Sequence, residues 1–405
     1  MQLHPILTAL RRNKVGAIVI CVQMAITLAI LCNALFIIEQ RLASSARPTG
    51  TVEAELFAID NEWVGAATDL PARARADIAA LRSLPDVADA YSTASYPLEN
   101  GGWLQGVAIK PNQDDETAQA TTYFGDEHML PTLGLKLVAG RNFNAVDIGE
   151  HTSNEAPVSP GIIVTRALAD KLFPDGSALG RSVYIESPDR GMPIVGIVDR
   201  LAAPWTRIEA ADVYENSVIE PFRYADKAGS YMVRAKPHRL AAAMQAAQVK
   251  LDEVNGARVL SKVRSFAQLR ATAYRDDRGL AIILGVVCAA LVAVTAFGIV
   301  GLTSYWVAQR RRQIGIRRAL GATRSAIVRY FQIENLLIAG VSAGLGAGLA
   351  VSINLWMVQG FAMTRLSPGY VLAGAVLVLL LGQVSVLWPA LRAASIAPAL
   401  ATRGA

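Results

Sequence analysis

The sequence predicts a membrane protein with four transmembrane α-helices and one large α+β domain outside the membrane. Of its 405 residues 53% are hydrophobic and only 18% are charged, which is too apolar for an ordinary soluble protein. Four long runs are free or nearly free of charge, and a hydrophilic segment, 39–278, separates the first run from the second. A helix needs about 20 apolar residues to cross a bilayer. We therefore expect a multi-pass protein with both termini in the cytoplasm and the large domain on the outer side of the membrane.

The first predicted span is the uncharged run 15–38, which follows a basic N-terminal segment, 1–14. A cleavable signal peptide is the alternative, because small residues at 43–46 could form a cleavage site. The run is longer than the roughly 7–15 residues of a signal core and fits a complete span. We predict an uncleaved first transmembrane helix.

The segment 39–278 combines strand and helix patterns in two places. Two strand–helix–strand patterns at its opposite ends predict a split βαβ-type subdomain whose halves fold together. The block between them, about 113–199, is rich in glycine, proline and polar turns and predicts an inserted mixed α/β subdomain. The expected elements are strands at 51–60, 87–93, 162–165, 230–235 and 257–264, and helices at 75–84, 166–173 and 239–255.

Helical character resumes at 265, and we expect it to continue without a break into the second span, 279–308. A cytoplasmic loop (309–326), a third span (327–357), an outer turn (358–369), a fourth span (370–391) and a cytoplasmic tail (392–405) follow. In the third span Gly340, Gly344 and Gly348 recur every four residues. This spacing is typical of helices that approach closely, but glycine is also common in transmembrane helices, and both interpretations stay open.

The loop 309–326 carries the densest positive charge in the chain, with no acid before Glu334. Loops rich in arginine stay in the cytoplasm, which sets the orientation of the chain. Isoleucine and leucine alternate with the arginines, as in an amphipathic helix at the membrane surface. Gly321 is expected to end this helix and Thr323 to cap the next. The loop is either a topology signal held against anionic lipid or a docking helix for a cytoplasmic partner.

Several activities lack their motifs. No phosphate-binding loop, metalloprotease, hydrolase or kinase motif occurs, so we expect no catalytic residue and no cofactor or metal bound by this chain. We interpret the consecutive residues Asp126, Glu127 and His128 as solvated surface rather than as a metal site. Basic residues beside a span more often set topology than bind nucleic acid, so no nucleic-acid partner is expected. Glu334 is a functional candidate as a membrane-proximal carboxylate, unless it snorkels or pairs with Arg324, Arg329 or another helix.

The arginine loop resembles the signature of the MacB/FtsX/LolC superfamily of ABC transporter permeases. Its residues 314–315 and 318–322 match the family's "I-G" and "R-A-L-G-A" stretches, whereas Gln313 replaces the usual acid. The ending Pro389-Ala390 to Pro398 resembles the family's C-terminal motif. The segments around 133–143 and 172–198 resemble the MacB-type periplasmic domain in the same order.

The resemblance implies a non-catalytic permease subunit of the mechanotransmission type. A separate ATPase subunit, which would bind ATP and Mg²⁺, is expected to dock under the loop. A second permease subunit, identical or paralogous, is expected to pair through spans one and two, and a periplasmic adaptor is a further possible partner. The expected ATPase-coupling residues are Ile314, Gly315, Ile316, Arg317, Arg318, Ala319, Leu320, Gly321 and Ala322.

Three functions remain open. The favoured one is a MacB-like export permease that expels or extracts a substrate outside the inner membrane. The second is an FtsX-like regulator of an extracytoplasmic hydrolase, which transports nothing. The third is a membrane-bound ligand sensor, which would need a cytoplasmic output. The sequence does not name a substrate.

Overall fold

The computed structural model describes residues 14–65, 69–151, 159–185, 189–206, 212–361 and 364–395. The predicted N-terminal segment before Lys14 and the tail beyond Ser395 lie outside the described residues. The chain divides into two compact units. We call them the helical unit (Met1–Ala43 and Asp277–Ala405) and the α/β unit (Ser44–Asp276).

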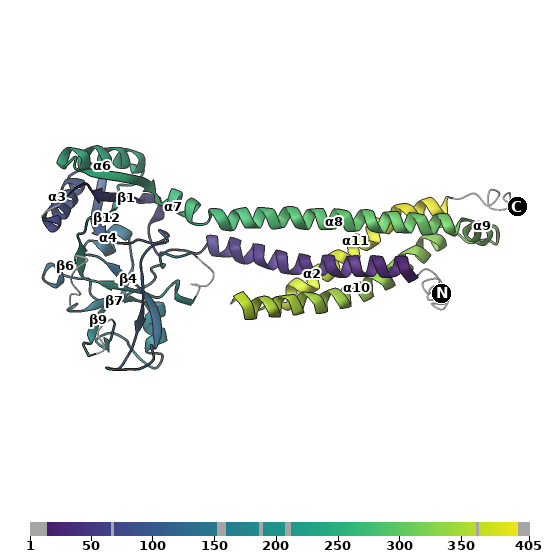
Figure 1. Ribbon diagram of the computed structural model, residues 1–405, viewed down its shortest axis with the longest axis horizontal. Coiled ribbons are helices and arrows are strands. Elements are labelled where there is room, and N and C mark those ends of the chain that lie inside the picture. The colour runs from purple at the N-terminus through teal and green to yellow at the C-terminus, as the bar shows by residue number, and fades with distance from the viewer. Residues whose placement is uncertain are drawn as a thin grey trace. The chain divides into compact units, whose positions relative to one another are not determined.

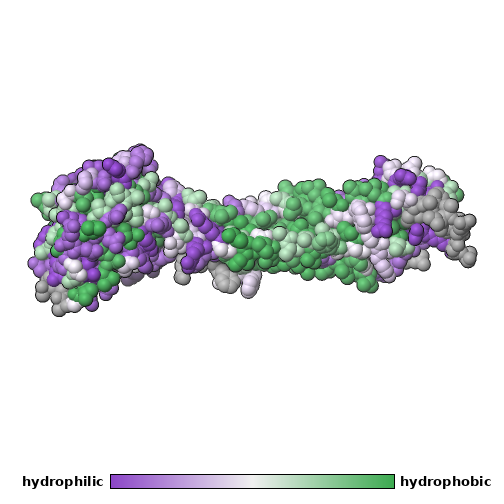
Figure 2. All heavy atoms as spheres, turned by 90° about the horizontal axis from the view of Figure 1, so that it is seen from above, coloured by the Kyte–Doolittle hydropathy of each residue, from purple (hydrophilic) through white to green (hydrophobic). Residues whose placement is uncertain are grey.

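Among the described residues of the helical unit, four helices are long and apolar enough to cross a membrane. Each of them contains one predicted span and extends beyond it at both ends. They expose many apolar side chains, and Figure 2 shows the surface of this unit as largely hydrophobic. The helices are α2 (Lys14–Ser45), α8 (Arg275–Gln309), α10 (Arg324–Phe361) and α11 (Pro368–Ala394) (Figure 1).

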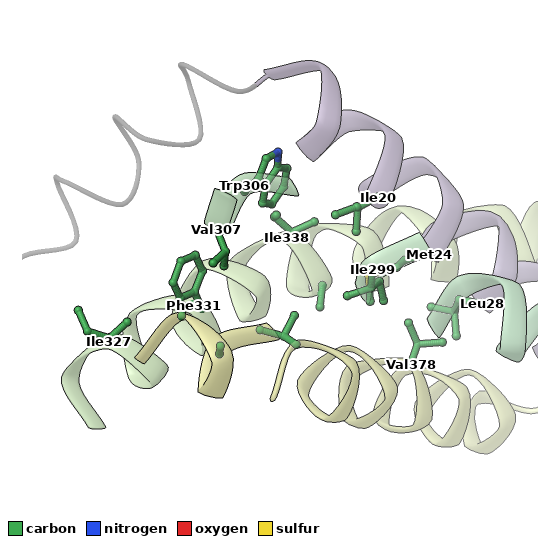
Figure 3. Close-up of a cluster of buried hydrophobic side chains, with 14 of the residues drawn as sticks. Ile20, Met24, Leu28, Ile299, Trp306, Val307, Ile327, Phe331, Ile338 and Val378 are labelled. Atoms are coloured by element: carbon green, nitrogen blue, oxygen red, sulfur yellow. The ribbon is translucent and has the colours of Figure 1, made fainter. Parts of the chain in front are cut away.

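Helix α2 is the centre of the helical unit. Side chains from all four long helices meet in one buried cluster that includes Met24, Leu28, Ile299, Ile338 and Val378 (Figure 3). Polar contacts reinforce this packing. The Thr27 and Thr295 hydroxyls lie 2.8 Å apart between α2 and α8, and Asn33 Nδ2 donates to the Ala350 carbonyl of α10 at 3.1 Å. Such bonds satisfy polar groups that lipid cannot satisfy.

Helices α2 and α10 approach each other closely at a glycine other than those that the sequence predicts. Gly340, Gly344 and Gly348 are exposed, and a Cβ added at any of them would meet no other described atom within 4 Å. The prediction that they pack helices together is therefore wrong for contacts within the described chain. Gly346 instead lies against α2, where an added Cβ would come within 2.8 Å of the Ala25 carbonyl oxygen. Two residues along a helix turn the side chain by about 200°, so the spacing identified the wrong face.

The ends of the α/β unit form the split subdomain that the sequence predicts. Its four-stranded sheet has the order β13-β1-β12-β2, and every neighbouring pair is antiparallel. This is the ferredoxin-like arrangement in which each βαβ half is split by a strand of the other. The elements are β1 (Leu56–Trp63), α3 (Leu70–Arg82), β2 (Val87–Thr93), β12 (Ala228–Ala235), α6 (Leu240–Val254) and β13 (Arg258–Ser265).

Helices α3 and α6 lie side by side on one face of this sheet (Figure 1). Phe57 and Ile59 of β1 point to these helices, whereas Leu56 and Ala58 belong to the cluster on the opposite face. A fully buried ion pair joins the two halves: Arg258 of β13 binds Asp77 of α3 through two nitrogens at 2.6 and 2.8 Å. Removing one partner of such a pair typically costs about 3–5 kcal/mol.

The inserted subdomain is wider than the predicted block 113–199. Its seven-stranded sheet has the order β3-β4-β10-β7-β9-β5, with β8 paired to β9, so it includes strands on both sides of that block. Strands of four or five residues, such as β3 and β10, give little signal in the sequence. The strands are β3 (Trp103–Val107), β4 (Ala118–Phe124), β5 (Leu137–Gly140), β7 (Ile162–Thr165), β8 (Ser182–Val183), β9 (Met192–Val198) and β10 (Ser217–Glu220).

Smaller elements complete this subdomain. Two short helices, α4 (Met129–Leu133) and α5 (Arg166–Leu172), follow β4 and β7 in the chain. A separate two-stranded sheet pairs β6 (Gly149–His151) with β11 (Phe222–Tyr224), and a 3₁₀ turn (Ala145–Asp147) precedes β6. Another 3₁₀ turn, Glu53–Glu55, leads into β1.

The helix that follows β13 is not continuous with the second span. Helix α7 (Phe266–Ala273) ends at Tyr274, and α8 begins at Arg275. Ser265 caps α7 by accepting a bond from the Gln268 amide at 3.3 Å. Tyr274 is 1% exposed because its ring packs into the core of the α/β unit. This burial holds Tyr274, the residue that follows α7, in a non-helical conformation, so the prediction of an unbroken helix is wrong.

A partly buried carboxylate lies beside the centre of the four-stranded sheet. Asp60 of β1 accepts hydrogen bonds from the Tyr96 hydroxyl at 3.0 Å and from Arg264 of β13 at 3.1 Å. Glu99, in the loop after β2, accepts a bond from the Tyr96 amide at 3.2 Å. Burial and the negative charge of nearby Asp60 raise the pKa of Glu99 to about 7.

The first prediction concerns the glycine contact between α2 and α10. Gly346→Ala forces the two helices apart, because the new methyl group overlaps the Ala25 carbonyl and the Leu28 side chain. We expect a loss of about 1–3 kcal/mol, measured as a lower thermal unfolding midpoint of the full chain in detergent. Gly344→Ala is the matched control, since open space surrounds it. An equal loss in both variants would contradict this packing.

The second prediction follows from Glu99. An acid that is harder to ionise in the folded state binds more protons there, so stability falls as pH rises from about 4.5 to about 7. We expect Glu99→Gln to remove this fall, which is at most about 1.4 kcal/mol per pH unit. Urea unfolding of the full chain in detergent at pH 5 and pH 7.5 measures it. Glu62→Gln, at an exposed position of the same sheet, controls for the loss of one negative charge. If stability still falls with pH in Glu99→Gln, the fall is caused by another titrating group.

Candidate coupling site at the arginine-rich helix

The arginine loop forms the short helix α9 (Arg311–Ala319) between α8 and α10. Leu320 follows its last turn, and Gly321 then adopts a φ of +94°, a conformation that favours glycine. The Ala322 amide donates back to the Arg317 carbonyl at 3.0 Å, which closes the turn. Thr323 Oγ1 accepts from the Ala326 amide at 3.2 Å and caps α10. The predicted helix end and the predicted cap are both present.

The predicted coupling residues fall on two faces of α9. Ile314 and Gly315 are buried, and Ile314 belongs to the central cluster of the helical unit. Ile316 is 47% exposed and Leu320 is 83% exposed. The amphipathic helix predicted from the sequence would place Ile314, Ile316 and Leu320 on one apolar surface. This prediction is wrong, because residues 314 and 316 point about 200° apart around a helix.

The exposed face is a stripe of four side chains at helical spacing, which we call the α9 stripe. It consists of Gln313, Ile316, Arg317 and Leu320, at positions i, i+3, i+4 and i+7. Gln313, which replaces the acid of the family signature, therefore lies on the exposed side. Exposed leucine and isoleucine beside arginine make a surface that is both apolar and positively charged, as suits contact with a protein or a membrane surface.

Three arginines attach α9 and its junction with α8 to the long helices, and one of them, Arg317, belongs to the α9 stripe. Arg318 Nη1 donates to the Ala394 carbonyl at the end of α11, at 3.0 Å. The Arg317 guanidinium lies 5.2 Å from the ring centre of Tyr330 on α10. Arg310, which precedes α9, forms an ion pair with Glu334 of α10 at 3.0 Å. The sequence suggests Arg324, Arg329 or another helix as partners of Glu334, and the partner found is Arg310, at the junction of α8 and α9.

The sequence predicts a solvated surface around His128, but Asp126 is buried, while the side chains of Glu127 and His128 are 29% and 34% exposed. The Asp126 side chain is 1% exposed, and burial raises its pKa despite nearby Arg82 and Arg223. His128 Nδ1 lies 2.9 Å from Asp89 Oδ2. Alternating arginines and acids thus link α3 and β2 to the inserted subdomain. Within the described parts of the chain, no three His, Cys, Asp or Glu residues are placed to hold a metal ion.

Comparisons with known proteins agree with the two-unit organisation. The sequence model of the MacB-like periplasmic core domain matches residues 15–251, and that of the FtsX-like permease C-terminal domain matches residues 285–398. The second match contains α9 and Glu334. It ends before the last residues of the chain.

Two relatives illustrate the range of similar proteins. The uncharacterised ABC transporter permease YknZ of Bacillus subtilis is 24% identical over 302 residues, which are 73% of each chain. The macrolide export ATP-binding/permease protein MacB of Neisseria meningitidis is 23% identical over 270 residues. Those residues are 65% of this chain but only 39% of that protein.

A search of solved structures also finds a match at low similarity. The periplasmic region of MacB from Actinobacillus actinomycetemcomitans is 13% identical, with a TM-score of 0.35, and the match covers 55% of this chain and 94% of that one. The assignment of family rests on the sequence models, of which one alone covers more than half of the chain. The chain therefore belongs to the family of ABC transporter permeases that combine a MacB-like periplasmic core domain with an FtsX-like C-terminal domain.

Proposed function

We propose that this chain is the non-catalytic permease subunit of an ABC transporter. A separate ATPase subunit, carrying ATP and Mg²⁺, docks on the α9 stripe from the cytoplasm. ATP-driven movement of that subunit passes through the helical unit to the α/β unit, which expels or extracts a substrate in the periplasm. A second permease subunit pairs with this one through α2 and α8. Membership of the permease family supports this proposal.

The observation that carries the proposal is the α9 stripe. Leu320 and Ile316 expose apolar surface on a helix whose opposite face is packed against the membrane helices. The arginines of α9 keep this loop in the cytoplasm. A force on the stripe would act on a helix that is already fixed to α10 and α11, and not on a free loop.

A regulator of an extracytoplasmic hydrolase is the second candidate, because the C-terminal third of the chain matches the FtsX-like model. The two functions differ in what contacts the inserted subdomain. Photocrosslinking from exposed Val146 of that subdomain distinguishes them: capture of a cell-wall hydrolase alone favours regulation, and capture of an adaptor or a transported substrate favours export.

The third prediction tests docking. Ile316→Asp combined with Leu320→Asp places two charges on the α9 stripe without touching buried Ile314. We expect at least about tenfold weaker retention of the ATPase subunit, because desolvating charge in an apolar contact costs more than about 1.4 kcal/mol. Affinity purification from detergent, followed by an ATPase assay, measures it. Val146→Asp, at an exposed apolar residue of the α/β unit, is the control.

Unchanged retention and unchanged ATPase activity in the double variant would show that the ATPase does not dock on this stripe. A wild-type chain that retains no ATPase under gentle extraction would contradict the proposed function itself. The arginine loop would then serve as a topology signal at the lipid surface.

A further inference from the structure

Glu334 is a carboxylate buried among membrane helices, and it requires a partner. It lies in the third turn of α10 with 2% of its side chain exposed. An ionised carboxylate is stable in such a place only if a positive charge and hydrogen bonds compensate it. Arg310 Nη1 provides both, at 3.1 and 3.0 Å from the two carboxylate oxygens. The Arg310 side chain is itself only 13% exposed, so solvent screens this pair weakly.

Arg310 occupies the junction between a long helix and α9. Its backbone N–H donates to the Trp306 carbonyl of α8 at 3.0 Å. Its carbonyl accepts from the Ile314 amide of α9 at 2.9 Å. One residue thus closes the last turn of α8 and opens the first turn of α9. Trp306 and Ile314 are both buried in the central cluster, so the junction is packed on either side (Figure 3 shows Trp306 and Val307 beside Phe331).

The ion pair is the buried member of a set of contacts that hold α9. The Arg317 contact with Tyr330 is partly exposed, and cation–π contacts at such places are weak. The Arg318 bond to the Ala394 carbonyl attaches the far end of α9 to α11. The Arg310–Glu334 pair alone among these couples two opposite charges out of solvent, so displacing it is more costly than displacing the others.

We propose that the Arg310–Glu334 pair is the joint through which α9 moves α10. Both are positioning residues: they contact neither nucleotide nor substrate. This inference rests on the proposed function, and it adds which contact transmits the movement. A displacement of the α9 stripe pulls on Arg310, and Arg310 carries Glu334 and the cytoplasmic part of α10 with it. Without the pair, α9 still docks the ATPase but moves independently of α10.

The test uses the full chain together with its ATPase subunit in lipid nanodiscs. Glu334→Gln keeps the size and one hydrogen-bonding oxygen but removes the charge. We expect it to retain the ATPase subunit as the wild type does. We expect stimulation of ATPase activity by the permease to fall about tenfold, within the usual range of coupling between two sites. Arg329→Gln, at an exposed arginine of the same helix, is the matched control for charge loss and leaves stimulation unchanged.

The exchanged pair, Arg310→Glu with Glu334→Arg, separates pairing from simple stability. It restores the ion pair with reversed charges, so we expect most of the stimulation to return. A loss caused only by misfolding would not return on exchange. The proposal would be overturned if Glu334→Gln stimulated ATPase activity as fully as the wild type. It would also be overturned if the exchanged pair stimulated ATPase activity no more than Glu334→Gln does.

A second readout does not depend on ATPase activity. Spin labels at exposed Arg312 of α9 and exposed Leu336 of α10 report the distance between the two helices in the permease alone. We expect one narrow distance distribution in the wild type and in the exchanged pair, and a broader one in Glu334→Gln. Equally wide distance distributions in the wild type, the exchanged pair and Glu334→Gln would overturn the proposed joint even if the ATPase docks. The wild type could retain no ATPase while the widths of the distance distributions still differ between the variants. That result would contradict the proposed function and leave the joint supported.

Discussion

The antiparallel pairing of β1 with β12 and β13 is the interaction on which the α/β unit depends. These strands come from opposite ends of the unit, and neither half can bury both faces of its strands alone. The pairing brings Asp77 to Arg258 and holds the inserted subdomain by both of its ends. Near the boundary of the unit, Arg270 of α7 donates to the Ser45 and Arg47 carbonyls and pairs with Glu53. The first and last segments of the unit are thereby fixed to each other.

A different constraint governs the helical unit. In an apolar surrounding each backbone polar group must be satisfied within its own helix, so the unit consists of long helices with few polar contacts between them. Those contacts are buried between the helices, as is the contact between Thr27 and Thr295. The short helix α9 departs from this pattern, because it exposes the apolar residues of the α9 stripe and is attached to the long helices through arginines. The proposed docking of an ATPase subunit depends on this combination.

The residues that sequence reasoning misplaced share a physical cause. In α10 the glycine that contacts α2 lies two positions from Gly344, and in α9 buried Ile314 lies two positions from exposed Ile316. Two positions turn a side chain by about 200° around a helix. Asp126 stands among polar neighbours in the sequence, yet tertiary packing buries it. Glu334 was recognised as an exceptional carboxylate, but its partner Arg310 is 24 residues away, on the other side of a turn. Local patterns contain no information about such distances.

The sequence by itself determined the number and order of the spans, the two βαβ halves, strand β2, strand β7 and the basic loop between the second and third spans. These features depend on hydropathy, periodicity and charge, which are local properties of the chain. The tertiary structure decided the width of the inserted sheet, the break at Tyr274, the helix faces that touch and the pairing of Glu334 with Arg310. Each of these depends on which distant side chains compete for the same buried space, and that competition is settled only when the chain has folded.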